Sequence, residues 1–367
     1  MKREHCALFL PSLVVGGAER MMLNIAKGLV EEGHKVDLIL VKAEGEFLTQ
    51  VPESIRVVDL ESSRVLKSLY PLIQYLRDTD PDVLLSTITP TNVIAVWASI
   101  TPGVDVRHTI RVARPESEAA KVQNNTKKEQ VTAALARHSY PYADEIIAIS
   151  EGVADDLKKN TSLNNRQIHV IYNPVVTDEL KKQASEPVDH PWFSAEVPVV
   201  LGVGRLVDQK DFATLIRAFG RLREDREARL VIYGDGNKRS ELEHLVHELG
   251  VESDVDLPGF TNNPFKYMAN ADVFVNSAKH EGFGNVIIET MACGTPIVAT
   301  DCPGAPAELL GNGEFGHLVP VGDPESMATK VHEMLSAPTS SETLRNRGND
   351  FTLETAIRRY CMVLFNQ

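Results

Sequence analysis

Cysteine, basic charge and long apolar runs are all scarce in this chain of 367 residues. Lysine and arginine number 38 against 51 acidic residues, which gives a formal net charge of −13. Nucleic-acid-binding proteins usually carry a basic total, so we expect no nucleic-acid partner. The cysteines lie far apart with no CxxC pair, which favours reduced thiols over a disulfide framework or a zinc site. They are Cys6, Cys293, Cys302 and Cys361.

No apolar stretch reaches the roughly 18 residues that a membrane-spanning helix needs. The apolar run near the N-terminus is brief, and Gly16–Glu19 follows it where a signal peptide would have its cleavage site. We therefore interpret this run as a first strand. We expect a cytoplasmic protein, with any membrane contact peripheral and at the cytoplasmic face of the cell membrane.

The length and composition are those of a two-domain globular protein. Hydrophobic residues make up 43% of the chain and charged residues 24%, which is typical of a soluble protein. At about 150 residues per domain, the length predicts two domains.

Short β-branched runs alternate with amphipathic segments along the first half. The segment Gly17–Glu31 has apolar residues at the spacing of one helix face. A strand, a helix and another strand in succession indicate a parallel sheet with right-handed crossovers. The predicted strands are Cys6–Leu10, Val36–Val41, Ile55–Leu60, Val83–Thr87 and Ile146–Ile149.

The same alternation begins again after Asn173–Pro174, a dipeptide that interrupts regular structure. The predicted strands there are Val197–Val203, Arg229–Tyr233, Val255–Leu257, Val273–Asn276 and Pro296–Ala299, and the helices are Ala213–Arg223, Arg239–Leu249, Asn285–Cys293 and Glu325–Leu335. The pattern predicts two Rossmann-like parallel-sheet α/β domains facing across a cleft. We place them at residues 1–172 and 173–350, with a C-terminal helix over residues 351–367 that crosses back to the first domain.

The most specific cluster in the chain is His280–Asn285 with Glu289 behind it. Gly282 and Gly284 remove side chains where the backbone must approach a ligand closely, and the N-terminus of the helix after them favours an anion such as a pyrophosphate. The carboxylate of Glu281 suits sugar hydroxyls, and that of Glu289 suits a ribose diol. The alternative is a glycine-rich turn with a charged cap and one surface glutamate.

A second cluster places two cations, Arg205 and Lys210, in a polar loop between a strand and a helix. At the carboxyl edge of a parallel sheet, an arginine and a lysine can neutralise a departing diphosphate as its charge develops. The alternative is a pair of ordinary solvated loop cations.

Weaker glycine signals follow other strands. Gly16–Gly17 with Glu19 opens the first helix, but it lacks the full GxGxxG pattern and the later acidic residue of a dinucleotide site. Gly234, and Gly259 with Phe260, also follow strands, and the second pair could receive a nucleobase. Turn chemistry explains these glycines equally well.

Together these clusters resemble glycosyltransferase family four, the retaining enzymes of the two-Rossmann-domain (GT-B) type. The likeness is strongest over residues 202–323, where GRLVDQKDF, VIYGDG, LPGF, EGFGNVIIE, ACGTPIVAT and GHLVPVGD stand at the family's spacing. The resemblance implies a retaining, metal-independent hexosyltransferase that uses no cofactor. Its donor would be a nucleotide sugar, most simply UDP-linked, and its acceptor a glycan or lipid-linked glycan in cell-surface polysaccharide synthesis.

Carried over by position, the resemblance assigns catalysis to Arg205, Lys210 and Glu281, with the two cations on the diphosphate, Glu281 on the sugar and Glu289 on the ribose. The other implied donor-binding residues are Gly204, Gly234, Gly259, Phe260, Gly282, Phe283, Gly284, Asn285 and Val286. The first domain would bind the acceptor.

In the first domain, the implied acceptor or phosphate loop includes Gly16, Gly17 and Glu19. Relatives carry a functional His or Glu after a first-domain strand. In this sequence His108 stands slightly before the position of that residue in the relatives, and Arg111 stands at the equivalent position. A core or surface role for His108 remains the alternative.

Positive charge gathers locally in the first half despite the acidic total. The segment 107–138 has seven Lys or Arg residues against Glu116, Glu118 and Glu129. A further basic group, Arg64, Lys67 and Arg77, surrounds the apolar residues Leu66, Leu69, Tyr70, Ile73 and Leu76. Such segments are attracted to anionic membranes, although solvated helix faces explain the same charges.

The competing functions are a nucleotide-sugar epimerase, a nonenzymatic nucleotide-sugar sensor and an oxidoreductase.

Overall fold

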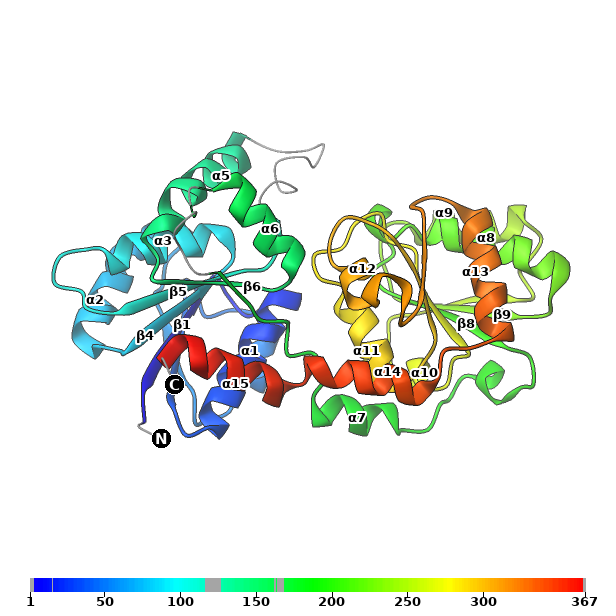
Figure 1. The fold of residues 1–367 in the computed structure, drawn as a ribbon, viewed down its shortest axis with the longest axis horizontal. Coiled ribbons are helices and arrows are strands. Elements are labelled where there is room, and N and C mark those ends of the chain that lie inside the picture. The colour runs from blue at the N-terminus through cyan, green and yellow to red at the C-terminus, as the bar shows by residue number, and fades with distance from the viewer. Residues whose placement is uncertain (1–2, 15, 116–126, 162, 164–167, 366–367) are drawn as a thin grey trace. The chain divides into compact units, whose positions relative to one another are not determined.

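The computed structural model describes residues 3–14, 16–115, 127–161, 163 and 168–365. They form two compact units, Met1–Pro174 with Leu353–Gln367, and Val175–Thr352. Each unit is a parallel sheet with helices on its faces (Figure 1). The predicted fold class of two parallel-sheet α/β units is confirmed.

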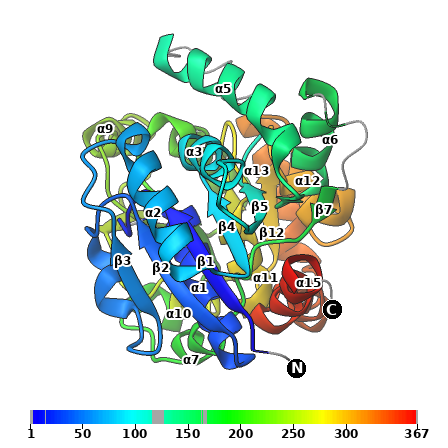
Figure 2. The same ribbon diagram turned by 90° about the vertical axis from the view of Figure 1, so that its left-hand side faces the viewer.

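The described residues of the first unit contain seven parallel strands in the order β3-β2-β1-β4-β5-β6-β7. They are β1 His5–Leu10, β2 Lys35–Leu40, β3 Arg56–Asp59, β4 Val83–Thr87, β5 Arg107–Val112, β6 Glu145–Ala148 and β7 Ile168–Val170. Figure 2 shows β3, β2, β1 and β4 side by side. Cys6–Leu10 of β1 is fully buried, as expected for a central strand covered on both faces.

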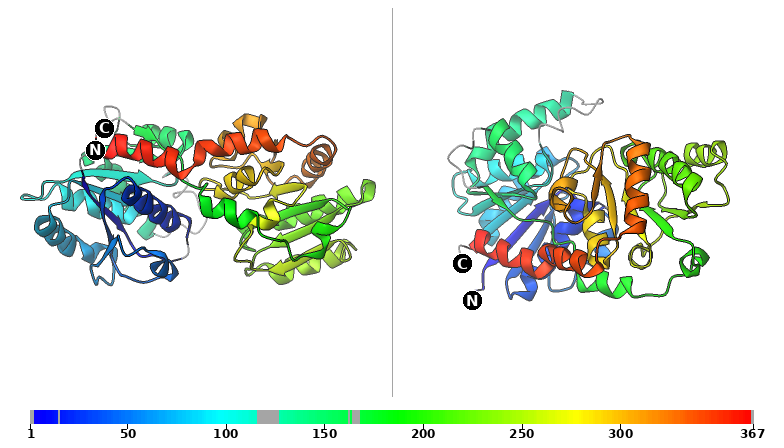
Figure 3. Two further views of the ribbon diagram at one scale, coloured as in Figure 1. Left: turned by 90° about the horizontal axis from the view of Figure 1, so that it is seen from below. Right: turned by 45° about the vertical axis from the view of Figure 1, so that its right-hand side comes forward.

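Helices cover both faces of this first sheet. They are α1 Gly17–Glu31, α2 Leu69–Thr79, α3 Thr89–Ser99, α5 Lys127–Ser139, α6 Glu151–Asn160 and α15 Leu353–Phe365. The core on one face joins strand residues to α1 and α15, and the core on the other face joins them to α2 and α3. Helix α15 lies beside α1 (Figures 1 and 3). At their contact a Cβ added to Gly28 would be 2.4 Å from Cγ1 of Ile357, so the close approach requires glycine.

The second unit has six parallel strands in the order β10-β9-β8-β11-β12-β13, all of its residues being described. They are β8 Val199–Val203, β9 Arg229–Tyr233, β10 Val255–Gly259, β11 Val273–Asn276, β12 Ile297–Thr300 and β13 His317–Val319. The helices are α7 Asp178–Ala184, α8 Phe212–Asp225, α9 Arg239–Glu248, α10 Phe265–Met268, α11 Asn285–Cys293, α12 Pro306–Leu309, α13 Pro324–Ser336 and α14 Ser341–Gly348. One core joins the strands to α8, α9 and α13.

Three strands, β5, β7 and β13, are not among those predicted from the sequence. The sequence of β5, RHTIRV, interrupts its apolar residues with His108 and Arg111, so it shows no continuous apolar run. Strands β7 and β13 have only three residues each, which is too short for a pattern. The helix predicted at Gly17–Glu31 and the one at Asn285–Cys293 have the predicted bounds.

Candidate functional site

The second sheet changes direction between β8 and β11. From β8 the chain goes to β9 on one side, whereas β11 pairs with β8 on the other side. In open α/β sheets, ligands bind outside the carboxyl ends of the strands at such a switch point. Lys210 lies in the loop that follows β8, and Glu281 lies in the loop that follows β11. Two of the predicted catalytic residues are therefore at the switch point.

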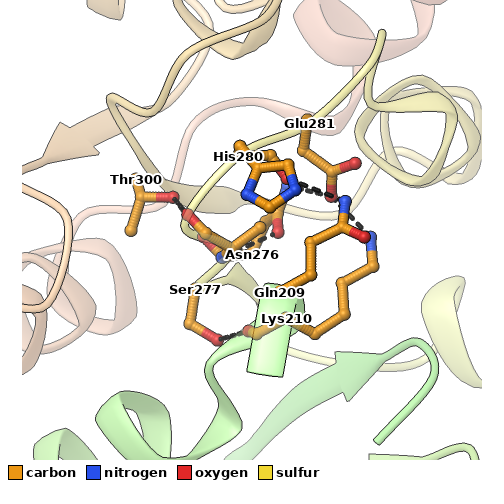
Figure 4. Close-up of polar contacts among 8 residues, drawn as sticks. Gln209, Lys210, Asn276, Ser277, His280, Glu281 and Thr300 are labelled. Carbon is orange, nitrogen blue, oxygen red and sulfur yellow. Dashed lines mark hydrogen bonds and ion pairs between the residues drawn. The ribbon is translucent and has the colours of Figure 1, made fainter. Parts of the chain in front are cut away.

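Lys210 and Glu281 form an ion pair. The Nζ of Lys210 is 2.5 Å from Oε1 of Glu281, and the two side chains are only 17% and 8% exposed. Removing one partner of an ion pair this well buried would leave the other charge without compensation, which costs far more than breaking a surface pair. A lysine ammonium has three donors, so Lys210 can bind a second anionic group while it holds the carboxylate (Figure 4).

The two loops are joined to each other by further hydrogen bonds. Nε2 of Gln209 donates to the His280 carbonyl at 2.9 Å, and Oγ of Ser277 donates to the Lys210 carbonyl at 2.8 Å (Figure 4). The backbone N–H of Lys279 donates to the Gln209 carbonyl at 2.8 Å. These hydrogen bonds hold the two loops together, and with them the Lys210 ammonium and the Glu281 carboxylate.

Helix α11 begins directly after the glycine pair. Gly284 is its N-cap residue at φ 90°, and no side chain caps the N-terminus. Such a helix end attracts a phosphate through its dipole and its first N–H groups. Gly282 is exposed, Asn285, Val286 and Glu289 are half-buried, and Phe283 is buried with its ring against Phe351. The side chain of Phe283 therefore contributes packing.

The backbone of Glu281 is fixed by the loop after β12. Its N–H donates to the Pro303 carbonyl at 3.0 Å. Gly304 lies against it at φ 124°, and a Cβ there would be 2.0 Å from the Glu281 carbonyl oxygen. Sequence reasoning gave no role to Gly304, because glycine is required there by a contact with Glu281, which lies in a different loop.

The other glycines of the predicted donor site have packing reasons of their own. Gly234 has φ 146°, and an added Cβ would be 1.8 Å from the carbonyl oxygen of Gly204. The N–H of Gly234 donates to the Gly259 carbonyl at 2.8 Å. Arg205 follows Gly204 and is exposed. These contacts place Arg205 beside the strand ends without fixing its side chain.

A cavity of about 680 Å³ opens beside Phe260, at the end of β10. Its walls include Trp192, Tyr233, Asp256 and Tyr267. The rings of Tyr233 and Tyr267 stack with centroids 4.0 Å apart, and the ring of Phe260 is 75% exposed. The volume is that of a small-molecule site. Sequence reasoning found Phe260 but missed the other walls, because Trp192 and Tyr267 come from separate segments.

Charges at the cavity rim are paired. Asp189 accepts a hydrogen bond from the Tyr267 hydroxyl at 2.5 Å and forms an ion pair with Lys266 at 3.1 Å. The Tyr267 hydrogen bond, followed by that from Lys266, lowers the pKa of Asp189 to about 2. Nε2 of His190 is 3.0 Å from Oδ2 of Asp256. The rim therefore offers cationic and anionic groups side by side.

In the first unit, Gly16 and Gly17 form the N-terminus of α1, at the carboxyl end of β1. The strand order places the switch point of this sheet between β1 and β4. Glu19 lies over the start of the helix, since a Cβ on Gly16 would be 2.2 Å from its carboxylate oxygen. Gly16 is half-buried and Gly17 is exposed.

His108 lies within β5, and its side chain is fully buried. Ser86 donates its hydroxyl proton to Oδ1 of Asn92 at 2.8 Å, so Nε2 of His108, 3.0 Å away, must be the donor to Ser86. Nδ1 then carries a lone pair with no partner among the described residues. Burial lowers the pKa of His108 to about 3. The structure places this histidine in the core and not in a loop.

Arg111 is also buried, with 1% exposure. Its guanidinium donates to the hydroxyl of Tyr360 at 3.1 Å, to Oγ1 of Thr87 at 3.2 Å and to Oδ1 of Asn173. Arg111 thus connects β5 to β4 through Thr87, to the C-terminal helix α15 through Tyr360, and to Asn173. The predicted residues of the first unit are therefore divided between the start of α1 and the interior of β5.

Among the residues described, no group of three or more His, Cys, Asp or Glu is placed to hold a metal ion.

Two parallel-sheet α/β units, one with a cation and a carboxylate at its switch point, define the class of two-domain glycosyltransferases. The family model described as "Glycosyltransferase Family 4" matches residues 15–179, and "Glycosyl transferases group 1" matches residues 190–351. A Campylobacter jejuni N-acetylgalactosamine-N,N'-diacetylbacillosaminyl-diphospho-undecaprenol 4-alpha-N-acetylgalactosaminyltransferase is 31% identical over 94% of this chain and 93% of its own. The chain belongs to glycosyltransferase family 4, and it is an enzyme of the GT-B type.

Solved structures show the same fold. A glycosyltransferase from Rickettsia africae matches with a TM-score of 0.81 at 18% identity, over 100% of this chain and 99% of that one. The Anabaena protein Alr3699/HepE, solved with UDP-glucose, matches with a TM-score of 0.77 at 21% identity over 100% of both chains.

Proposed function

We propose that this glycosyltransferase moves a hexose or N-acetylhexosamine from a UDP-sugar to a lipid-diphosphate-linked glycan with retention at the anomeric carbon. The observation that carries the proposal is the buried Lys210–Glu281 pair at the switch point, with the N-terminus of α11 beside it. Lys210, Arg205 and this helix end supply positive potential for a diphosphate, and the Glu281 carboxylate supplies a hydroxyl acceptor. An epimerase or a sensor would need no acceptor.

The cavity beside Phe260 is proposed as the nucleobase subsite. It opens at the end of β10, which is two strands from β8 in the sheet. At the usual strand spacing, β10 and β8 are about 10 Å apart. A diphosphate at Lys210 and a base in this cavity would be separated by a ribose, the group assigned to Glu289. Aromatic walls suit a flat base, and the paired polar groups suit its edge.

In the proposed reaction, the anomeric carbon loses its bond to the leaving phosphate oxygen and gains a bond to the acceptor hydroxyl oxygen. The acceptor proton passes to the leaving phosphate, so no separate general base is required. Lys210 and Arg205 stabilise the charge that develops on that phosphate, the term that usually dominates such catalysis. The Campylobacter relative's name specifies an alpha-linked product, and an alpha product from an alpha-linked donor is net retention. No metal takes part in this proposal.

The donor proposal is tested by thermal shift with UDP-, GDP- and ADP-sugars. At about 100 times the dissociation constant, a ligand stabilises the folded state by about 2.7 kcal/mol. We expect a UDP-sugar to raise the melting temperature and Glu289→Ala to reduce that shift. An equal response to all three nucleotides, together with a normal response of Glu289→Ala, would count against the ribose assignment.

The transfer proposal is tested by incubating the protein with the bound UDP-sugar and an undecaprenyl-diphosphate-linked glycan, an acceptor of the kind named in the Campylobacter relative. A lengthened lipid-linked glycan with an alpha linkage is expected. Formation of an epimer from the nucleotide sugar alone would favour the epimerase, and binding without turnover would favour the sensor.

A lipid-linked acceptor leads us to propose an anionic membrane as a partner of the first unit. Leu66 and Tyr70 are each 66% exposed, and Arg64 and Lys67 beside them are exposed as well. Apolar residues among lysines and arginines suit an anionic interface. Within the described residues, no helix combines the length and the apolar character that crossing a bilayer requires.

The structure narrows the charged surface expected from the sequence. Leu76 is 2% exposed and belongs to the core, so it is wrong to count it in this surface. Arg111 is buried, and Arg107 is held by Glu145 at 2.9 Å. Glu116, Glu118 and Lys121 of the basic segment 107–138 lie outside the described residues. The membrane proposal therefore rests on Arg64–Tyr70.

Flotation with anionic vesicles at low salt tests this surface. We expect the protein to float with the vesicles and Leu66→Asp with Tyr70→Asp to abolish flotation. Met362→Asp is the matched control, because Met362 is 57% exposed on another helix of the same unit. An equal loss in the control, or no flotation of the natural protein, would remove the membrane from the proposal.

A further inference from the structure

Asn276 ends strand β11 beneath the Lys210–Glu281 pair, and only 5% of it is exposed. Its Oδ1 accepts a hydrogen bond from the backbone N–H of Ala278 at 3.3 Å. Its Nδ2 lies 3.5 Å from Oε1 of Glu281. Because the oxygen of the amide faces a donor, its NH2 group must face the carboxylate. The orientation of the side chain follows from its partners (Figure 4).

The backbone around Asn276 is held independently of its side chain. Oγ1 of Thr300, on the neighbouring strand β12, donates to the Ala278 carbonyl at 2.6 Å and approaches the Asn276 carbonyl at 3.4 Å. Thr300 is fully buried. This strand-to-loop contact fixes the turn after β11, and with it the N–H that orients the Asn276 amide.

Both donors near Glu281 reach the same oxygen. Lys210 and Asn276 each approach Oε1, and Oε2 accepts no hydrogen bond from the described part of the chain. A buried carboxylate is stable only when donors satisfy it. Two donors on Oε1 fix the rotation of the carboxylate and leave the lone pairs of Oε2 for a ligand hydroxyl.

We propose that Asn276 is a positioning residue for the donor sugar: it holds Oε1 of Glu281 together with Lys210, and so selects Oε2 as the oxygen that binds a sugar hydroxyl. The inference rests on the proposed function, since it assigns a sugar to Glu281. It concerns the sugar only. The nucleotide part of the donor does not depend on the rotation of this carboxylate.

The test compares Asn276→Asp with the natural protein. The substitution keeps the size and the acceptor of the Ala278 N–H, but it turns an oxygen towards Glu281 in place of the donor. Isothermal titration with the UDP-sugar selected by thermal shift, and separately with UDP, gives the readout. We expect the dissociation constant of the UDP-sugar to rise about tenfold more than that of UDP, because the added charge acts on the diphosphate of both ligands, whereas the lost hydrogen bond to the carboxylate affects only the sugar. The kcat/KM for transfer falls at least as much as the UDP-sugar affinity.

Thr295→Val is the structural control. Thr295 is 2% exposed, and its hydroxyl donates to the Met268 carbonyl before the start of β12, away from Asn276, Ala278 and Glu281. Its loss should lower the melting temperature but weaken the binding of UDP and of the UDP-sugar equally. Asn276→Ser, which is shorter and cannot reach Glu281, provides a second variant if Asn276→Asp does not fold. A folded variant at Asn276 that retains the natural affinity for the UDP-sugar would overturn the inference alone. A natural protein that binds no nucleotide sugar would overturn both the inference and the proposed function.

Discussion

Lys210 and Lys279 allow a comparison at the scale of single residues, because each lysine pairs with a carboxylate across the same two loops. Lys210–Glu281 has side chains 17% and 8% exposed, whereas Lys279–Asp208, at 2.7 Å, has side chains 40% and 74% exposed. Lys210→Met leaves a buried carboxylate without its cation and is expected to destabilise the second unit by about 3 kcal/mol. Lys279→Met removes a surface pair and should cost under about 1 kcal/mol.

Urea unfolding and steady-state transfer assays measure the two effects. Lys210→Met should also lower kcat by about a hundredfold or more, because it removes a cation from the leaving group. Lys279→Met should leave kcat within about twofold, since its ammonium faces solvent. Equal rates in the two variants would show that Lys210 has only a structural role.

Lys210 and Glu281 could be predicted as site residues from the sequence, but the contact between their side chains could not. Lys210 and Glu281 are predicted by the glycine-rich and polar loops around them, and the pairing of β8 with β11 then brings residues 71 positions apart within 2.5 Å. Asn276 could not be predicted, because a polar residue at a strand end has no pattern of its own. For His108 the sequence leaves two roles open, a site role implied by the resemblance and a core or surface role, because β5 has no continuous apolar run that would assign this residue to the sheet.

At the scale of elements, the junction of the loops after β8, β9 and β10 depends on close backbone contacts. Gly234 has φ 146° and would place a Cβ 1.8 Å from the Gly204 carbonyl oxygen. Gly234→Ala must therefore displace one loop against another. Gly250 also has a positive φ, 66°, but nothing lies within 4 Å of the position of its Cβ. Comparing alanine variants at the two glycines therefore separates the cost of backbone strain from the cost of steric overlap.

Gly250→Ala is expected to cost only the left-handed strain of about 1–2 kcal/mol. Gly234→Ala should cost at least about 3 kcal/mol or prevent folding, since overlap of this kind with backbone adds to the strain. Thermal unfolding followed by circular dichroism measures both. A similar loss in the two variants would mean that the loop after β9 relaxes freely and that Gly234 serves a ligand instead.

At the scale of the whole molecule, the chain returns to its first unit only at its end. Helix α15 belongs to the first unit although residues 175–352 precede it. It packs against α1, and its buried residues share one core with α1, β1, β2 and β4. Sequence periodicity predicts this helix because one apolar face is plain in residues 353–365. The buried Arg111, which binds Tyr360 of this helix, could not be predicted, since an arginine in a strand normally indicates an edge facing solvent.

The return of the chain predicts that a change in the last helix destabilises the first unit and spares the second, although the second is its nearer neighbour in sequence. Leu364 is fully buried and Met362 is 57% exposed on the same helix. Leu364→Ala should cost about 2–5 kcal/mol, and Met362→Ala under about 0.5 kcal/mol. Native-state hydrogen exchange gives the location: protection should fall in β1, β2 and α1 and stay unchanged in β8 to β13. Equal loss in both units would mean that they unfold as one cooperative body, because the helix then stabilises the two sheets together.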